Sequence, residues 1–167
     1  MEAAVKAAEE AINASKAEAM KYVPDQVKSL EDALAAAKEK IAKKEYKAAL
    51  EDLKGIPDKA KGLLEAAKAK KEELTKNWAD LSQGIPQMIE AAQKKVDTLS
   101  KSKKLPADIT QEKFDEVKSG LTAAKEEWTK ALDSFKAGNL AEAVSAAGSV
   151  KEKATAALEG LGLPVPG

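Results

Sequence analysis

Apolar residues recur at intervals of three, four and seven along almost the whole chain, which is the spacing of amphipathic α-helices. No stretch alternates between apolar and polar residues for more than a few positions, so the pattern does not favour β-strands. The stripes predict helices over residues 2–22, 24–42, 46–99, 108–136 and 140–160. We therefore expect an all-α protein in which helix covers well over two-thirds of the residues.

Prolines interrupt this pattern at three places. Val23-Pro24 indicates a restart or a kink between the first two helices, because proline restricts the residue before it and suits the first turn of a helix. Gly55-Ile56-Pro57 and Gly84-Ile85-Pro86 fall inside the third helix, but the apolar stripe keeps its phase across both. This continuity favours one long, bent rod from Tyr46 to Leu99. The alternative is a true break near Asn77 or at the second of these sequences.

Polar and glycine-containing segments separate the predicted helices. Ala137-Gly138-Asn139 is the strongest helix-turn-helix signal, because it places a glycine at a helix C-terminus before an N-cap asparagine. Asp108 and Gln111 have the spacing of a capping box, so a helix should begin there. The other breaks are a polar turn at Lys43-Lys44-Glu45, a loop over residues 100–110 and a flexible tail over residues 161–167.

A faint internal repeat relates two parts of the chain. A shift of 94 residues superimposes the apolar stripe of residues 23–66 on that of residues 117–160, and the turn at 43–45 on that at 137–139. Few identities accompany the shift, so the sequence leaves open whether these two similar helical hairpins arose by duplication. We predict a single domain over residues 1–160, an elongated antiparallel helical bundle with long, proline-bent helices.

The predicted core is thin, because most helical turns offer one large apolar residue with alanine beside it. Alanine lets helix axes approach closely but contributes little buried area. Large side chains must therefore anchor the packing, and Glu-to-Lys or Asp-to-Lys pairs four residues apart should solvate the opposite faces. The predicted anchors are Trp78, Phe114, Trp128 and Phe135.

The composition excludes several kinds of chemistry. The chain has 28 basic and 28 acidic residues, and every basic residue is lysine. Without histidine and cysteine there is no imidazole base, thiolate nucleophile, soft-metal ligand or disulfide, and without arginine there is no bidentate phosphate clamp. A net charge of zero gives no electrostatic reason to expect nucleic acid or an anionic membrane as a partner. No apolar run approaches the roughly 20 residues that span a bilayer.

Three groups of side chains are candidate sites, and each has a simpler interpretation. Adjacent acids such as Asp115-Glu116 point about 100° apart on a helix, so they do not converge on a metal or a substrate. The Lys101–Lys104 cluster offers an anionic docking site or merely a soluble loop. Tyr22 and Tyr46 flank one helix. They either line a ligand cleft or pack in the core with their hydroxyl groups exposed to water. We expect no catalytic, metal-binding or cofactor-binding residues.

An apolar ligand cleft is a further possibility at the bend predicted by Gly84-Ile85-Pro86. A kink flanked by a polarisable methionine and an aromatic side chain can open a pocket between helices. A simple bend requires no ligand and is the favoured interpretation. The residues that would line the cleft are Trp78, Leu81, Met88 and Ile89.

Two short resemblances accompany these patterns. Residues 45–50 and 138–143 resemble the turn and second-helix start of tetratricopeptide repeats, but the 34-residue period is absent. Tyr22-Val23-Pro24-Asp25, the alanine-rich residues 33–37 and Glu45-Tyr46-Lys47-Ala48-Ala49 resemble uncharacterised alanine- and lysine-rich helical proteins of the bacterial envelope, often lipoproteins. The chain lacks the lipidated cysteine of such lipoproteins. This resemblance implies an envelope location and no known catalysis.

These observations favour a non-catalytic structural or interaction protein of the bacterial cell envelope, which serves as a spacer or docking scaffold for a protein partner. The alternative is a carrier that binds an apolar ligand or a lipid between its helices. The expected location is periplasmic or outer-membrane-associated, with the cytoplasm as the alternative. An enzyme would require carboxylate chemistry alone, and we do not expect one.

Overall fold

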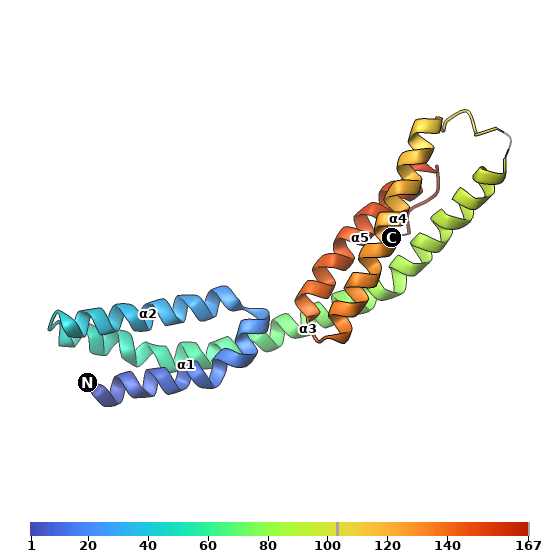
Figure 1. Cartoon of the computed structure of the whole chain (residues 1–167). Helices are drawn as coiled ribbons and strands as arrows, with labels where there is room; N and C mark the ends of the chain where they lie inside the picture. The colour runs from blue at the N-terminus through green and yellow to red at the C-terminus, as the bar shows by residue number, and fades with distance from the viewer. Residues whose placement is uncertain (103, 167) are drawn as a thin grey trace. The chain divides into compact units, whose positions relative to one another are not determined.

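The structure, a computed structural model, describes residues 1–102 and 104–166 and consists of helices joined by short segments (Figure 1). No strand occurs among the described residues, and the helices hold 21, 19, 56, 26 and 21 residues. The predicted all-α fold and the predicted share of helix are confirmed. The helices are α1 (Glu2–Tyr22), α2 (Pro24–Ala42), α3 (Tyr46–Lys101), α4 (Gln111–Lys136) and α5 (Leu140–Gly160).

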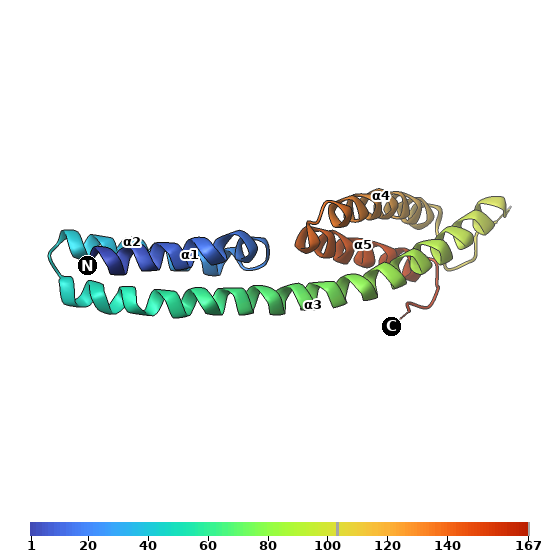
Figure 2. The ribbon, with the colours of Figure 1, turned by 90° about the horizontal axis from the view of Figure 1, so that it is seen from below.

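The long helix α3 passes through both Gly-Ile-Pro sequences without a break (Figure 2). This continuity confirms the prediction from the phase of the apolar stripe and rules out the alternative break. The isoleucines Ile56 and Ile85 are both almost completely buried. They therefore anchor α3 to a core at the two places where Pro57 and Pro86 remove a backbone hydrogen bond.

Contacts between the helices divide the chain into two compact units, where the sequence suggested one bundle over residues 1–160. Unit 1 (Met1–Glu73) contains α1, α2 and the first part of α3, and unit 2 (Leu74–Gly167) contains the rest of α3, α4 and α5. Each unit buries its own cluster of apolar side chains. Each is therefore a three-helix bundle with a separate core.

In unit 1, α1 and α2 run antiparallel and are joined by the single residue Val23 (Figure 1). Pro24 occupies the first turn of α2, where the N–H that it lacks would have no partner within the helix. The restart predicted at this position is confirmed. Lys16 Nζ of α1 lies 2.6 Å from Glu31 Oε1 of α2, so an ion pair joins the two helices across this hairpin.

In unit 2, α4 begins later than predicted. Thr110 is its N-cap, and the Thr110 hydroxyl oxygen accepts a hydrogen bond from the backbone N–H of Lys113 at 3.2 Å. The capping box predicted at Asp108 and Gln111 is therefore wrong. Ile109 is buried directly before the cap, so its packing on the core places the start of α4 at Thr110 and not at Asp108.

The chain beyond α5 stays on the core of unit 2 for a few residues. Leu161 is buried and Leu163 packs partly against the same core. Gly162 has a φ of 67°, and the N–H of Leu163 donates to the carbonyl of Leu158 at 2.9 Å, as in a common helix C-terminal motif. The segment predicted as a flexible tail thus begins with packed residues, and its last residue, Gly167, lies outside the described residues.

The α2–α3 and α4–α5 hairpins turn in the same way. In the first turn, the N–H of Glu45 donates to the carbonyl of Lys40 at 2.9 Å. In the second turn, the N–H of Asn139 donates to the carbonyl of Ser134 at the same distance. These residues are related by the shift of 94 positions that the sequence suggested. Asn139 is the N-cap of α5 as predicted, although its side chain makes no capping hydrogen bond.

Candidate functional site

Three aromatic side chains meet at one place in unit 2. The ring of Trp78, on α3, stacks on that of Phe135, on α4, with centroids 4.5 Å apart and planes inclined by 11°. The Trp78 ring also stacks on Trp128, with centroids 5.6 Å apart and planes inclined by 18°. Trp128 and Phe135 are seven residues apart and so share a face of α4. We call Trp78, Trp128 and Phe135 the aromatic stack.

The aromatic stack extends from the core of unit 2 to its surface. Trp78 is 7% exposed, Trp128 is half-buried and Phe135 is 44% exposed. The prediction that Phe135 anchors the core is therefore wrong, whereas buried Trp78 and Phe114 bear out their predicted role. Phe135 lies in the last turn of α4, next to the exposed turn at 137–139, where few residues are available to cover it.

The side chains of the predicted apolar cleft lie in the same unit and contribute to its core. Trp78, Met88 and Ile89 are buried, and Met88 is only 2% exposed. Leu81 is half-buried and packs against the same cluster. The structure thus brings the predicted residues together as packing residues, and only Trp78 among them belongs to the aromatic stack.

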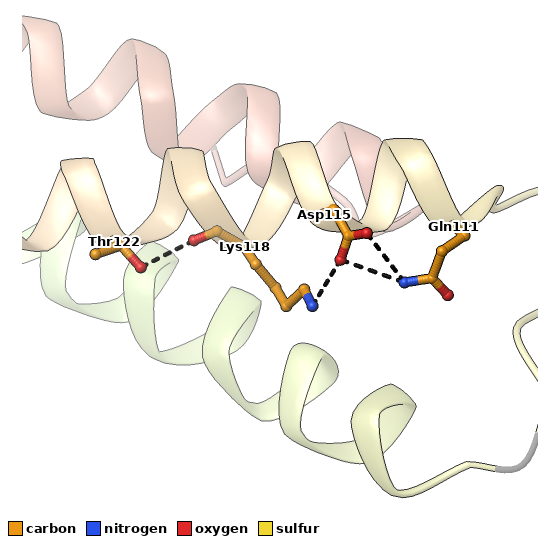
Figure 3. A network of polar contacts seen from close by, with 4 residues as sticks. All are labelled: Gln111, Asp115, Lys118 and Thr122. Atoms are coloured by element: carbon orange, nitrogen blue, oxygen red, sulfur yellow. Dashed lines mark hydrogen bonds and ion pairs between the residues drawn. The ribbon is translucent and has the colours of Figure 1, made fainter.

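A network of polar contacts follows the surface of α4 (Figure 3). Lys118 Nζ lies 2.7 Å from Asp115 Oδ1, and Gln111 Nε2 donates to both oxygens of that carboxylate at 3.2 Å. The hydroxyl of Thr122 donates to the carbonyl of Lys118 at 3.0 Å. The Lys118 ammonium, followed by the Gln111 amide, lowers the pKa of Asp115 below its ordinary value. These contacts join neighbouring turns of one helix and stabilise its surface.

Adjacent acids diverge, as predicted. Glu9 Oε1 lies 2.6 Å from Lys38 Nζ of α2, whereas Glu10 Oε1 lies 3.9 Å from Lys6 Nζ of its own helix. The two carboxylates thus point to different partners. They do not form the convergent pair that acid–base catalysis or a hard metal ion requires.

Glu127 joins α4 to α5. Its carboxylate pairs with the Lys153 ammonium and accepts a hydrogen bond from the Ser149 hydroxyl at 3.2 Å. The Lys153 ammonium is the main cause of a lowered pKa at Glu127, and partial burial of the carboxylate opposes it. This contact fastens two helices of unit 2 together.

The tyrosines and the lysine cluster lie apart from the aromatic stack along the chain. Tyr22 and Tyr46 flank opposite ends of α2, so they do not line one cleft. Tyr46 is 52% exposed, which contradicts core packing, whereas Tyr22 is half-buried with Lys71 Nζ 5.8 Å from its ring centroid. In the Lys101–Lys104 cluster, the first and last lysines are exposed and Lys103 lies outside the described residues.

Three features are absent from the part of the chain that the structure describes. No group of three or more acidic, histidine or cysteine side chains could hold a metal ion. No buried side-chain nitrogen or oxygen lacks a hydrogen-bond partner. No helix combines the length and the apolar character needed to cross a bilayer.

Two grooves that the sequence pattern did not indicate lie at equivalent places in the two hairpins. The groove of unit 1, of about 540 Å³, lies between α2 and α3, and that of unit 2, of about 230 Å³, lies between α4 and α5. The sequence feature that could have indicated these grooves is the shift of 94 residues. It superimposes Gln26 on Gly120, Lys59 on Lys153, Gly62 on Ala156 and Leu63 on Ala157.

Comparisons with known protein families, with curated proteins and with solved structures give no match.

Proposed function

We propose that this protein is a non-catalytic docking scaffold that binds a protein partner through the aromatic stack of unit 2. The observation that supports this function is Phe135, which is 44% exposed while its ring stacks on Trp78 at 4.5 Å. Large aromatic side chains dominate binding at many protein interfaces. Because packing already holds these rings in place, a partner would lose little side-chain entropy in contacting them.

The rest of the molecule supports a role without catalysis. The shifted carboxylates Asp115 and Glu127 owe their lowered pKa values to lysines that pair with them at the surface and between helices. Catalytic carboxylates usually have raised pKa values or share a site with a second titratable group. The arrangement therefore offers apolar contact area and no convergent acid and base.

We also propose the bacterial cell envelope, either the periplasm or the outer membrane, as the location of this docking. The support is the resemblance of residues 22–25 and 45–49 to envelope proteins, segments that form the α1–α2 junction and the start of α3. Fractionation of cells that carry the full-length gene with a tag tests this proposal. Recovery with the periplasmic or membrane fraction is expected, and recovery with cytoplasmic markers alone would contradict it.

Site-specific photocrosslinking in native cells tests the docking function. A photoreactive aromatic residue at position 135 should capture one defined protein, whereas the same residue at position 130 of α4 should not. Lys130 is a suitable control because it is exposed on the same helix. Its position, five residues away, turns it about 140° from Phe135 around the helix axis.

Binding of the purified partner then decides whether the contact is direct. The only two tryptophans, Trp78 and Trp128, both belong to the aromatic stack, so docking there should change the intrinsic fluorescence. Phe135→Ser should weaken binding at least tenfold, on the order of 1.4 kcal/mol, and Phe135→Tyr should retain it. Equal binding by both variants, with unchanged helix content, would refute the proposal.

A further inference from the structure

The groove of unit 1 is lined by an exposed lysine, Lys59. Among the described residues, Lys59 makes no ion pair or hydrogen bond through its side chain. Leu30, Ala33 and Leu63 provide apolar lining beside it. The groove therefore combines a free ammonium group with apolar surface from two helices.

The equivalent lysine of unit 2 shows what such a position can bind. Lys153 pairs with the carboxylate of Glu127, which also accepts a hydrogen bond from Ser149. In unit 1, the positions equivalent to Glu127 and Ser149 are Ala33 and Gly55. Unit 1 thus keeps the cation but replaces its anion with a methyl group, and its groove is more than twice as large.

We propose that the groove of unit 1 binds an amphipathic carboxylate, specifically a medium-chain fatty acid. Its carboxylate pairs with Lys59, as the carboxylate of Glu127 pairs with Lys153 in unit 2. Its alkyl chain lies along Ala33 and the edges of Leu30 and Leu63, each 4% exposed, so the apolar surface removed from water is mainly that of the ligand itself. The groove is open to solvent on one side, and its volume of about 540 Å³ is of the size of small-molecule sites, about 300–1,000 Å³.

The polar rim of the groove is compatible with this ligand. Gln26 and Ser29 add an amide and a hydroxyl that can donate hydrogen bonds to a carboxylate. Asp25 carries the opposing charge, but it lies in the first turn of α2, where the helix dipole partly offsets a negative charge. Asp25→Asn should therefore tighten binding of the fatty acid.

Nuclear magnetic resonance of the whole chain tests the proposal with dodecanoate labelled with carbon-13 at its carboxyl group, below its micelle concentration. We expect saturable shifts of the carboxyl resonance and of the backbone amides of Ser29 and Gly62. Lys59→Gln keeps most of the side-chain stem but removes the charge. It should weaken binding roughly fivefold, as expected for a partly exposed ion pair.

Two further variants separate the charge effect from loss of structure. Ala33→Glu installs the carboxylate that unit 2 carries and should abolish binding by pairing with Lys59, whereas Ala33→Gln, of similar size, should weaken binding less. Lys153→Gln, the matched change in unit 2, should leave dodecanoate binding unchanged. Circular dichroism verifies that each variant retains its helix content.

Three results would overturn the proposal. Lys59→Gln could bind dodecanoate as tightly as the unaltered chain. Dodecylammonium, which has the same alkyl chain and the opposite charge, could bind equally well. Finally, dodecanoate could change the fluorescence of Trp78 and Trp128 without shifting Ser29 or Gly62, which would place it at the aromatic stack.

Discussion

Lys44 and Gly138 occupy the same position in the two hairpin turns and share a positive φ, 63° for Lys44 and 83° for Gly138. Glycine adopts this left-handed conformation freely, whereas the Cβ of lysine meets the backbone there. The α2–α3 turn therefore carries strain at a position where the α4–α5 turn has none.

Replacement of this lysine tests the strain directly. Lys44→Gly should raise the free energy of unfolding by about 0.5–1 kcal/mol, because relief of the strain exceeds the entropy that glycine adds to the unfolded chain. Urea titration followed by far-ultraviolet circular dichroism measures the change. The matched change in the other turn, Gly138→Ala, should lower stability by about 1 kcal/mol. A loss of stability in Lys44→Gly would show that its side chain contributes more than its backbone costs.

A close approach of two helices in unit 2 gives a second prediction. A Cβ at Gly160 would lie 2.6 Å from Val117 Cγ2, closer than packed carbon atoms tolerate. Gly160→Ala should therefore destabilise unit 2 by roughly 1–3 kcal/mol. Urea unfolding followed by tryptophan fluorescence is a suitable assay, because both tryptophans lie in unit 2.

Gly148→Ala is the control for that change. Gly148 also lies in α5, and a Cβ there would meet nothing within 4 Å. It should stabilise the helix by up to about 1 kcal/mol. Val117→Ala combined with Gly160→Ala should cost less than the sum of the two single changes. Equal effects of Gly160→Ala and Gly148→Ala would mean that the helices separate at no cost.

The surface ion pairs give a prediction on pH. Asp115 and Glu127 have folded-state pKa values below their ordinary values, mainly because of Lys118 and Lys153 respectively. Each carboxylate therefore contributes stability that is present above its ordinary pKa, about 4, and is lost as the pH falls through the lowered folded-state pKa. Thermal melts in the acid range should show this loss, and it should be smaller in Glu127→Gln. An identical acid profile for that variant would contradict the assignment.

At alkaline pH, stability should depend on pH in the opposite direction. Hydrogen bonding to Asp52 raises the pKa of Lys40 above its ordinary value, so this pair contributes stability at neutral pH. The contribution is lost as the pH rises through the raised pKa. In thermal melts above pH 10, Asp52→Asn should lose less stability than the unaltered chain does.

Sequence periodicity predicted the helices well but did not predict which helices pack together. The course of α3 through Pro57 and Pro86 follows from the phase of its stripe, since a helix that keeps its phase can bury one continuous face. The boundary between the units at Glu73 and Leu74 has no such signal. No glycine or proline marks it, and the stripe runs through it unchanged, although the residues that it packs against differ on either side.

The candidate sites show the same limit. The spacing of Trp128 and Phe135 correctly placed both on one face of α4. It did not show how far along α4 the residues of the neighbouring helices cover that face. Exposure of Phe135 depends on that extent. Whether Lys59 has an anionic partner likewise depends on which residue of α2 faces it. That depends on how two helices pack together, and the periodicity of one helix does not show it.

Pro86 lies inside α3 with an exposed ring. Its missing N–H leaves the carbonyl of Ser82 without its usual helical partner, and its ring crowds the preceding turn. Little packing is lost when the exposed ring is removed. Pro86→Ala should therefore stabilise unit 2 by about 1–2 kcal/mol, after allowance for the greater entropy of the unfolded chain.

Tryptophan fluorescence in urea measures this change, and Ile85→Ala is its control. Ile85 is 1% exposed, so its truncation leaves a cavity and should cost roughly 2–5 kcal/mol. If Pro86→Ala destabilises unit 2 instead, the backbone geometry that proline imposes is itself required for the packing of α3 on α4 and α5. In that case Pro86→Ala should also red-shift the emission of the buried Trp78, whereas a purely local gain in helix stability leaves that emission unchanged.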